Sequence, residues 1–208
     1  FNKNTGIDGD IISCITTDTK NTVYAGLRSG KVYVINDTIS QEIDLAFDPS
    51  SMYYINALFF DNRDKTLLAV TTVNHYRIND SGIEKFKNGG SDFSKRKDGS
   101  IWIAIRGGMA KLTPSGIERS FYPAVHSQSY LALLEDSQGR IWFGGLQGLM
   151  QLSGKRLIPY GDNELLKSRV VDIVELEDKQ ICVATKGRGV LFVGSDTIRQ
   201  INTKNGLS

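Results

Sequence analysis

Short apolar runs alternate along the chain with turns made of Gly, Asn, Asp and Ser, and this pattern recurs five times. Each time, an apolar pair precedes a polar turn, an apolar run, a second turn and another apolar run. Apolar positions within the runs recur at every second residue, which is the period of a β-strand and not of a helix. The five segments are Ile12–Ile35, Ile55–Ile78, Phe93–Leu112, Tyr130–Leu152 and Val170–Val193.

These segments align position by position at intervals of about forty residues, which indicates an internal repeat. The central run of each begins at Val23, Leu67, Ile101, Ile141 and Ile181. An apolar residue lies at one fixed place before each of these starts, namely Ile15, Phe59, Phe93, Leu133 and Ile173. A turn residue follows each central run: Gly30, Asn74, Gly108, Gly148, and Arg188 with Gly189 next to it. Gly and Asn tolerate a left-handed backbone, so this second column predicts a tight turn between two strands.

A further turn and a short run close each segment, so each repeat contains four strands. The closing turns are Asn36-Asp37, Ser81-Gly82, Ser115-Gly116, Ser153-Gly154 and Gly194-Ser195-Asp196. Four strands joined by short turns are the unit of a β-propeller blade. The sequence therefore predicts an all-β fold: one β-propeller segment of five consecutive four-stranded antiparallel blades, at roughly 7–47, 48–87, 88–122, 123–162 and 163–206. Both ends lie at the same phase of the repeat, so we expect the chain to be part of a larger propeller.

One segment offers a competing interpretation. Residues Glu164 to Lys179 are rich in good helix formers and predict a helix on propensity alone. The repeat places Val170 and Ile173 in the columns of Ile12 and Ile15, which favours a strand. We expect the repeat to prevail, because tertiary context commonly overrides propensity.

Composition narrows the class of partner. The 208 residues carry a formal net charge of +2, and no Lys/Arg cluster interleaves with aromatic residues, so we expect no nucleic-acid partner. No apolar run approaches the length of about 20 residues that spans a bilayer, so we expect contact with a membrane only through the rest of a parent protein. Cys14 and Cys182 fall in predicted strands, where free thiols pack like small apolar groups, and their disulfide status stays open.

Two blocks of the sequence resemble the two-component-regulator propeller repeat, which is written as Asp, Gly, then LWIGT, then GL. The first block runs from Asp136 through Gly139, Ile141-Trp142 and Gly144 to Gly148-Leu149, and the second contains Asp98-Gly99, Ile101-Trp102 and Ala104. The end at Gly206-Leu207 and the start at Gly6-Ile7 are similar to the beginning of further repeats. The first two repeats depart from the pattern, with Tyr24 and Leu68 in the Trp column and Asn74 in place of a turn Gly.

This resemblance implies a function and a location. Such repeats usually build the extracytoplasmic sensor of a histidine kinase or hybrid two-component regulator, often tuned to glycans. It implies a periplasmic or cell-envelope ligand-binding module that acts in signal transduction. The alternative is an envelope scaffold or secretion-system propeller that mediates protein or polysaccharide interactions. The repeat motif consists of packing and turn residues, so it carries over no ligand-binding residue.

Sequence features of an enzyme are missing. His75 and His126 are the only histidines, and neither has a second ligand at zinc spacing. The chain contains no nucleophile-elbow motif and no Gly-rich phosphate loop. We therefore predict no catalytic residue, no metal and no cofactor. Trp102 and Trp142 share one column, where a sugar-stacking platform competes with packing between blades, and the sharing of that column by Tyr24, Leu68 and Cys182 favours packing.

Candidate ligand contacts lie in turns and loops. The turn between the second and third strands carries a cation in three of the five repeats, and in a propeller these turns lie on one face near the axis. Arginine pairs well with carboxylates and sulfates, which suggests an anionic oligosaccharide as ligand, with another protein as the alternative; plain charged surface is the competing explanation. The longer loops before each first strand open on the same face. The candidate ligand-binding residues are Arg28, Arg106, Lys186 and Arg188 in the turns, and Tyr54, Tyr122, His126 and Tyr160 in the loops.

Overall fold

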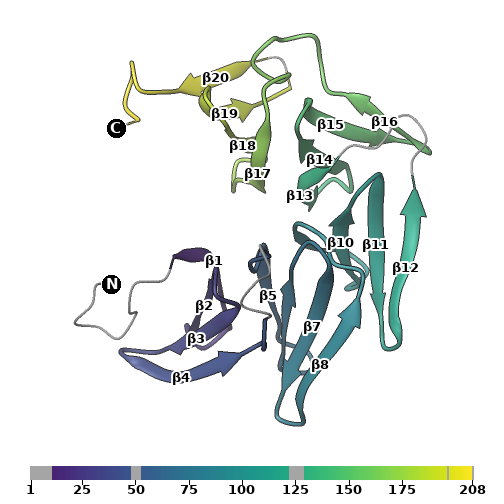
Figure 1. Ribbon diagram of the computed structural model, residues 1–208. Coiled ribbons are helices and arrows are strands. Elements are labelled where there is room, and N and C mark those ends of the chain that lie inside the picture. The colour runs from purple at the N-terminus through teal and green to yellow at the C-terminus, as the bar shows by residue number, and fades with distance from the viewer. Residues whose placement is uncertain (1–10, 48–52, 122–128, 196, 208) are drawn as a thin grey trace. The chain divides into compact units, whose positions relative to one another are not determined.

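The computed structural model describes residues 11–47, 53–121, 129–195 and 197–207, and these residues form strands and turns without a helix. Twenty strands make five four-stranded antiparallel sheets, and the strands of each sheet pair in chain order (Figure 1). The predicted fold class is thus confirmed: the chain is all-β, with five consecutive β-propeller blades. Among the described residues, no helix of the length and apolar character needed to cross a membrane is found.

The chain divides into two compact units, residues 1–92 and 93–208, and each is described by itself. Unit 1 holds blades 1 and 2, and unit 2 holds blades 3, 4 and 5. Blade 1 consists of β1 (Ile12–Thr17), β2 (Val23–Leu27), β3 (Lys31–Ile35) and β4 (Ile39–Asp44). Blade 2 consists of β5 (Ala57–Asp61), β6 (Thr66–Val70), β7 (Asn74–Asn79) and β8 (Gly82–Lys87). Blade 3 consists of β9 (Phe93–Lys95), β10 (Ile101–Ile105), β11 (Gly108–Thr113) and β12 (Gly116–Phe121). Blade 4 consists of β13 (Tyr130–Glu135), β14 (Ile141–Gly145), β15 (Gly148–Ser153) and β16 (Arg156–Pro159). Blade 5 consists of β17 (Val170–Glu175), β18 (Ile181–Thr185), β19 (Gly189–Val193) and β20 (Ile198–Ile201).

The competition between helix and strand after Glu164 is resolved in favour of the strand. Residues 164–167 form a turn, and β17 begins at Val170 and pairs antiparallel with β18, with Ile173 opposite Val183. Val170 and Ile173 are buried in the core that blade 5 shares with blade 4. Burial of these two side chains, together with the ladder of β17, outweighs the helix propensity of the segment.

Each blade has two edges, which differ in the strands that begin there. We call the edge where the first and third strands begin the upper edge, and the edge where the second and fourth strands begin the lower edge. Neighbouring blades of unit 2 have matching edges. At the upper edge, the Leu149 amide of blade 4 donates to the Leu166 carbonyl, just before blade 5, at 2.8 Å. At the lower edge, the Ser137 amide donates to Glu175 Oε2 of blade 5 at 2.7 Å, and the Lys97 amide donates to Glu135 Oε2 at 2.9 Å.

The cores lie between neighbouring blades and explain the column of small residues. A Cβ added to Gly144 would lie 2.4 Å from Cγ1 of Val170, so blade 5 packs directly on the backbone of β14. The apolar column that precedes the central strands is buried at Phe93, Leu133 and Ile173. Ile15 of blade 1 differs from this expectation, since its side chain is 66% exposed.

The Trp column is a packing column. Trp142 is 1% exposed in the core between blades 4 and 5, and its indole N–H donates to Oδ2 of the buried Asp136 at 2.8 Å. Trp102 is half-buried, and its indole N–H donates instead to Ser100 Oγ at 2.8 Å. The motif residues Asp136 and Trp142 therefore form one buried hydrogen-bonded pair.

Candidate functional site

The predicted basic residues of unit 2 lie at its upper edge. Arg106 is in the turn between β10 and β11, and Lys186 and Arg188 are in the turn between β18 and β19. All three side chains are exposed. The Lys186 amide donates to the Arg169 carbonyl at 2.8 Å, which fixes this turn against the segment that leads into β17. The turn with Lys186 and Arg188 is therefore anchored to the backbone that leads into blade 5.

In unit 1 the structure brings two of the predicted residues together. Arg28 lies in the turn between β2 and β3, and Tyr54 lies in the segment that leads into β5 of the next blade. The guanidinium carbon of Arg28 is 5.5 Å from the centre of the Tyr54 ring, within the range of a cation–π contact. Both side chains are exposed, and the Arg28 amide donates to the Ile11 carbonyl at 3.0 Å. The pair is an exposed cation on an aromatic surface.

A pocket of about 240 Å³ also lies at the upper edge of unit 1. Phe47, Tyr53 and Tyr76 give it aromatic walls, and the ammonium of Lys85 lies 5.8 Å from the centre of the Tyr76 ring. Tyr53, the neighbour of Tyr54 in sequence, is 44% exposed. Aromatic rings beside cations suit a ligand with both apolar faces and negative groups.

The other predicted loop residues have different outcomes. Tyr122 and His126 lie outside the described residues. Tyr160 follows β16, is half-buried, and packs edge-on against Trp142 with ring centres 4.7 Å apart. The convergence of all four basic residues on one channel mouth stays a prediction, because Arg28 belongs to unit 1 and the other three to unit 2.

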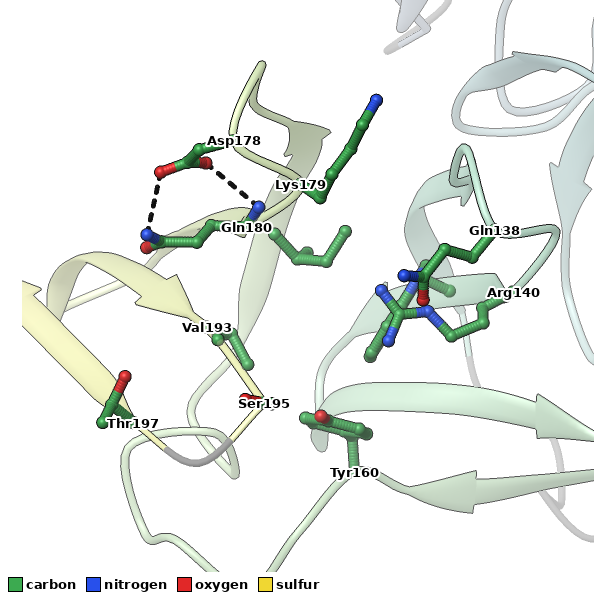
Figure 2. Close-up of a pocket in the computed structure, with 12 residues that line it drawn as sticks. Gln138, Arg140, Tyr160, Asp178, Lys179, Gln180, Val193, Ser195 and Thr197 are labelled. Atoms are coloured by element: carbon green, nitrogen blue, oxygen red, sulfur yellow. Dashed lines mark hydrogen bonds between the residues drawn. The ribbon is translucent and has the colours of Figure 1, made fainter.

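The sequence did not predict a second feature, a pocket of about 450 Å³ between blades 4 and 5 at the lower edge. Figure 2 shows Gln138, Arg140 and Tyr160 of blade 4 facing Asp178, Gln180 and Val193 of blade 5. Of these, only Tyr160 was a predicted contact. Val193 ends β19 and the others fall in turns between paired strands, and only the packing of one blade on the next brings them together. No residue spacing in the sequence predicts that these side chains line one pocket.

Arg140 is held in this pocket by charge and by stacking. Its Nε donates to Asp136 Oδ2 at 2.5 Å, and its guanidinium carbon is 5.1 Å from the centre of the Trp142 ring. Burial raises the pKa of Asp136, but the hydrogen bonds from Trp142 and Arg140 outweigh burial and keep that pKa below its ordinary value. Asp136 is therefore ionised at neutral pH, and it neutralises the charge of Arg140.

The described residues do not assemble a metal centre. No group of three His, Cys, Asp or Glu side chains among them is arranged to hold a metal ion. His75 is fully buried and stacks on Phe86, and both cysteines are free thiols. Burial raises the pKa of Cys14 to about 11, which leaves this thiol protonated at neutral pH.

Comparison with known proteins agrees with the repeat motif. Residues 125–147 match the family model of the two component regulator propeller, which confirms the resemblance found in the sequence. No curated protein matches the chain in sequence.

Solved structures with a similar fold come from several kinds of protein. Virginiamycin B lyase from Staphylococcus aureus, in a catalytically inactive variant with quinupristin, shares 16% identity at a TM-score of 0.78, covering 95% of this chain and 72% of that one. The extracellular domain of the hybrid two component system BT3049 from B. thetaiotaomicron shares 14% identity at 0.59, covering 99% and 36%. PorZ, a surface component of the type-IX secretion system of Porphyromonas gingivalis, shares 17% at 0.64, covering 93% and 34%. The chain thus spans about a third of the length of the last two proteins, and all three show the fold alone.

Proposed function

We propose that this chain is a non-catalytic, ligand-binding part of an extracytoplasmic sensor propeller of the two-component type. The match of residues 125–147 to the regulator propeller supports this role, as does the fold shared with the extracellular domain of a hybrid two-component system. The location outside the cytoplasm belongs to the same proposal. The ligand that the upper edge suits best is an anionic oligosaccharide.

The observation that carries the ligand class is the stacked pair of Arg28 and Tyr54. An exposed guanidinium presents donors in a planar fork that matches a carboxylate or sulfate, and the exposed ring beside it offers a flat face to a sugar. The neighbouring pocket continues this chemistry with Tyr53, Tyr76 and Lys85. Unit 2 repeats the cation at matching turns, with Arg106 in blade 3 and Lys186 in blade 5.

The fold also occurs in a lyase, so the absence of catalysis needs its own argument. His75 is fully buried: its Nδ1–H donates to the Asn88 carbonyl at 2.9 Å, and its ring stacks on Phe86. A general base must reach the proton that it removes, and a ring enclosed in this way does not reach a bound substrate. The described turns of the upper edge supply cations and hydroxyls, which bind and orient but do not form a nucleophile–base pair.

The experiment compares two double variants with the same change in charge. Lys186→Ala/Arg188→Ala removes two exposed cations from the upper edge of blade 5, and Lys155→Ala/Arg156→Ala removes two from the lower edge of blade 4. Calorimetric titration with a short oligogalacturonate should show at least tenfold weaker binding for the first variant and little change for the second. The affinity of the native chain should fall with added salt, because exposed charge pairs are screened.

Arg28→Ala tests unit 1 in the same titration. We expect a tenfold loss of affinity, since the variant removes the cation that stacks on Tyr54. Equal affinities for native protein and both upper-edge variants would reject the proposed binding surface and leave only a charged exterior.

A further inference from the structure

A crevice of the same kind recurs between neighbouring blades, but its lining differs from place to place. Between blades 1 and 2, at the lower edge, a crevice of about 400 Å³ has an apolar floor, where Tyr24 stacks on Phe60 at 5.1 Å between ring centres, and charged side chains of Lys65 and Asp80 on its rim. The equivalent crevice between blades 4 and 5 has Trp142 in the place of Tyr24, and carboxamides and hydroxyls join the charged side chains of its rim. Packing between blades explains the apolar floor of each crevice and does not require the carboxamides and hydroxyls of the second.

The polar groups of the blade 4–5 pocket come from both walls. Gln138 of blade 4 and Gln180 of blade 5 offer carboxamides, and Asp178 offers a carboxylate. Ser195 and Thr197, in the turn after β19, add hydroxyls. Carboxamides and hydroxyls can donate and accept at one site, which is what a row of ligand hydroxyl groups requires.

The aromatic part of the lining is fixed in orientation. The ring of Tyr160 packs edge-on against Trp142 at 4.7 Å, and Figure 2 shows it facing Ser195 across the pocket. Tyr160, Val193 and Ser195 also line an adjoining pocket of about 410 Å³. The two hollows therefore form a groove around Tyr160. Their volumes fall within the range of about 300 to 1,000 Å³ that is common for small-molecule sites.

Most charges of the groove are balanced, and the remainder is negative. Arg140 is paired with the buried Asp136, and Asp178 and Lys179 are neighbours of opposite charge on the facing turn. Asp162 also lines the adjoining pocket and adds one negative charge. The lining is also held in place without a ligand. Arg140 is bonded and stacked, and Gln180 Nε2 donates to Asp178 Oδ2 at 2.8 Å. A preorganised polar groove with one fixed aromatic ring and a small excess of negative charge suits an uncharged, hydroxyl-rich ring better than an acidic one.

We propose that the groove between blades 4 and 5, which we call the lower groove, binds a neutral pyranose. Gln138, Gln180 and Ser195 line it at the lower edge of unit 2, and its adjoining pocket extends to Leu166 in the segment before blade 5; Arg106, Lys186 and Arg188 line neither pocket. The lower groove is thus a second ligand site that differs from the upper edge in ligand charge as well as in position. A ligand bound there joins Trp142 of β14 and Tyr160, which follows β16, to the turns of blade 5.

The experiment uses the 208-residue chain and four probes of one ring size: the methyl pyranosides of glucose, galactose and mannose, and galacturonate. Binding is followed by chemical shifts of the side-chain amides of Gln138 and Gln180 and of the backbone amide of Thr197. At least one neutral pyranoside should shift all three sets of signals, and galacturonate should bind at least tenfold more weakly. Failure of every neutral probe, or tighter binding of galacturonate, overturns the proposal.

Gln138→Ala is the main test variant, because this side chain is exposed in a turn and its removal leaves the core intact. Gln147→Ala, an exposed glutamine at the upper edge of the same blade, is the matched control. We expect at least a tenfold loss of pyranoside affinity for the first and less than a twofold change for the second. Tyr160→Phe, which keeps the ring and its contact with Trp142, should retain the fold and lose only the contribution of the hydroxyl.

Equal effects of Gln138→Ala and Gln147→Ala would remove the lower groove as the site. The oligogalacturonate titration uses a charged probe and residues of the opposite edge. The two proposals are therefore tested independently, and one can fail while the other holds.

Discussion

Replacing Asp136 with Asn tests whether one buried carboxylate holds blade 4 together. Asp136 is 1% exposed and accepts four hydrogen bonds. Its Oδ1 accepts from the amides of Gln138 at 2.9 Å and Arg140 at 2.8 Å. Its Oδ2 accepts from Arg140 Nε at 2.5 Å and from Trp142 Nε1 at 2.8 Å. All four partners are N–H donors, so the carboxylate of Asp136 only accepts hydrogen bonds, and these partners offer no acceptor to a donor placed there.

Asparagine keeps the shape of Asp136 but replaces one oxygen with an NH₂ group. In either orientation that NH₂ faces two N–H donors, and two of the four hydrogen bonds are lost. An unpaired buried donor such as the Trp142 indole costs about 1–3 kcal/mol. The partly exposed Arg140 side chain can turn to water, so its share is smaller, about 1 kcal/mol. We expect Asp136→Asn to lower the free energy of unfolding by about 3 kcal/mol.

For a chain of this size, 1 kcal/mol corresponds to about 2–4 °C in Tm, so the variant should melt about 6–12 °C lower. Scanning calorimetry measures the shift, with Asp98→Asn as the control. Asp98 is the exposed aspartate of the matching turn in blade 3, where Oδ1 accepts from the Ser100 amide at 2.8 Å. The same oxygen accepts from Ser100 Oγ at 2.6 Å, and the carbonyl oxygen of an Asn side chain can accept both hydrogen bonds, so Asp98→Asn should melt close to the native chain.

The pH dependence gives an independent check on Asp136. Its folded pKa lies below its ordinary value, so it contributes stability above the pKa of the unfolded chain and loses it as the pH falls through the folded pKa. The Asn variant has no such group and should lose less stability in acid than the native chain. Equal melting temperatures for Asp136→Asn and Asp98→Asn would refute the assignment of the buried acceptor.

Two further predictions concern stability. Burial, together with the charge of Arg77, lowers the pKa of His75 against an opposing hydrogen bond to Asn88, so the unfolded chain takes up this proton at a higher pH than the folded chain. Unfolding by urea should therefore become easier as the pH falls below about 6.5, by at most about 1.4 kcal/mol per pH unit, and His75→Phe should flatten this slope. A Cβ at Gly148 would lie 2.0 Å from the Leu166 carbonyl oxygen, and the φ of this residue is +103°, so Gly148→Ala should lower the free energy of unfolding by about 3 kcal/mol. The control is Gly116→Ala, at a φ of +139° with open space around it, which should cost about 1 kcal/mol. Similar melting curves for the two alanine variants would contradict the steric argument.

The repeat made the strands predictable. Four of the five central strands begin at the residues that the alignment gave, and β6 begins one residue earlier than Leu67. The turn column was predicted in part: Gly30, Gly148 and Gly189 have a left-handed backbone, and at Gly148 and Gly189 the next segment passes closely. In blade 3 the left-handed residue is Gly107, one position before the predicted Gly108. The exposure of Ile15 could not be predicted from the sequence, since burial of an apolar column depends on what packs against each blade.

The candidate site was predictable only in part, for a physical reason. Arg106 and Lys186 could be placed at one edge because position in the repeat determines the edge. The stacking of Arg28 on Tyr54 joins a turn of one blade to a segment of the next, and no spacing encodes that contact. The lower groove likewise depends on the packing of one blade against the next, so nothing in the sequence marked Gln138 and Gln180 as site residues.

The repeat separates folding from binding at the level of single residues. The first residue of the turn after the second strand is Arg28 in blade 1, Arg106 in blade 3, Leu146 in blade 4 and Lys186 in blade 5, and all four side chains are exposed. The neighbouring Gly sets the turn, so this first residue changes from blade to blade without a change in the core. In these four blades the surface takes its charge from one variable residue each, whereas the matching residue of blade 2, Thr71, is buried. The apolar Leu146, 53% exposed beside cationic turns, shows that the upper edge varies in chemistry along unit 2 while its strands keep one register.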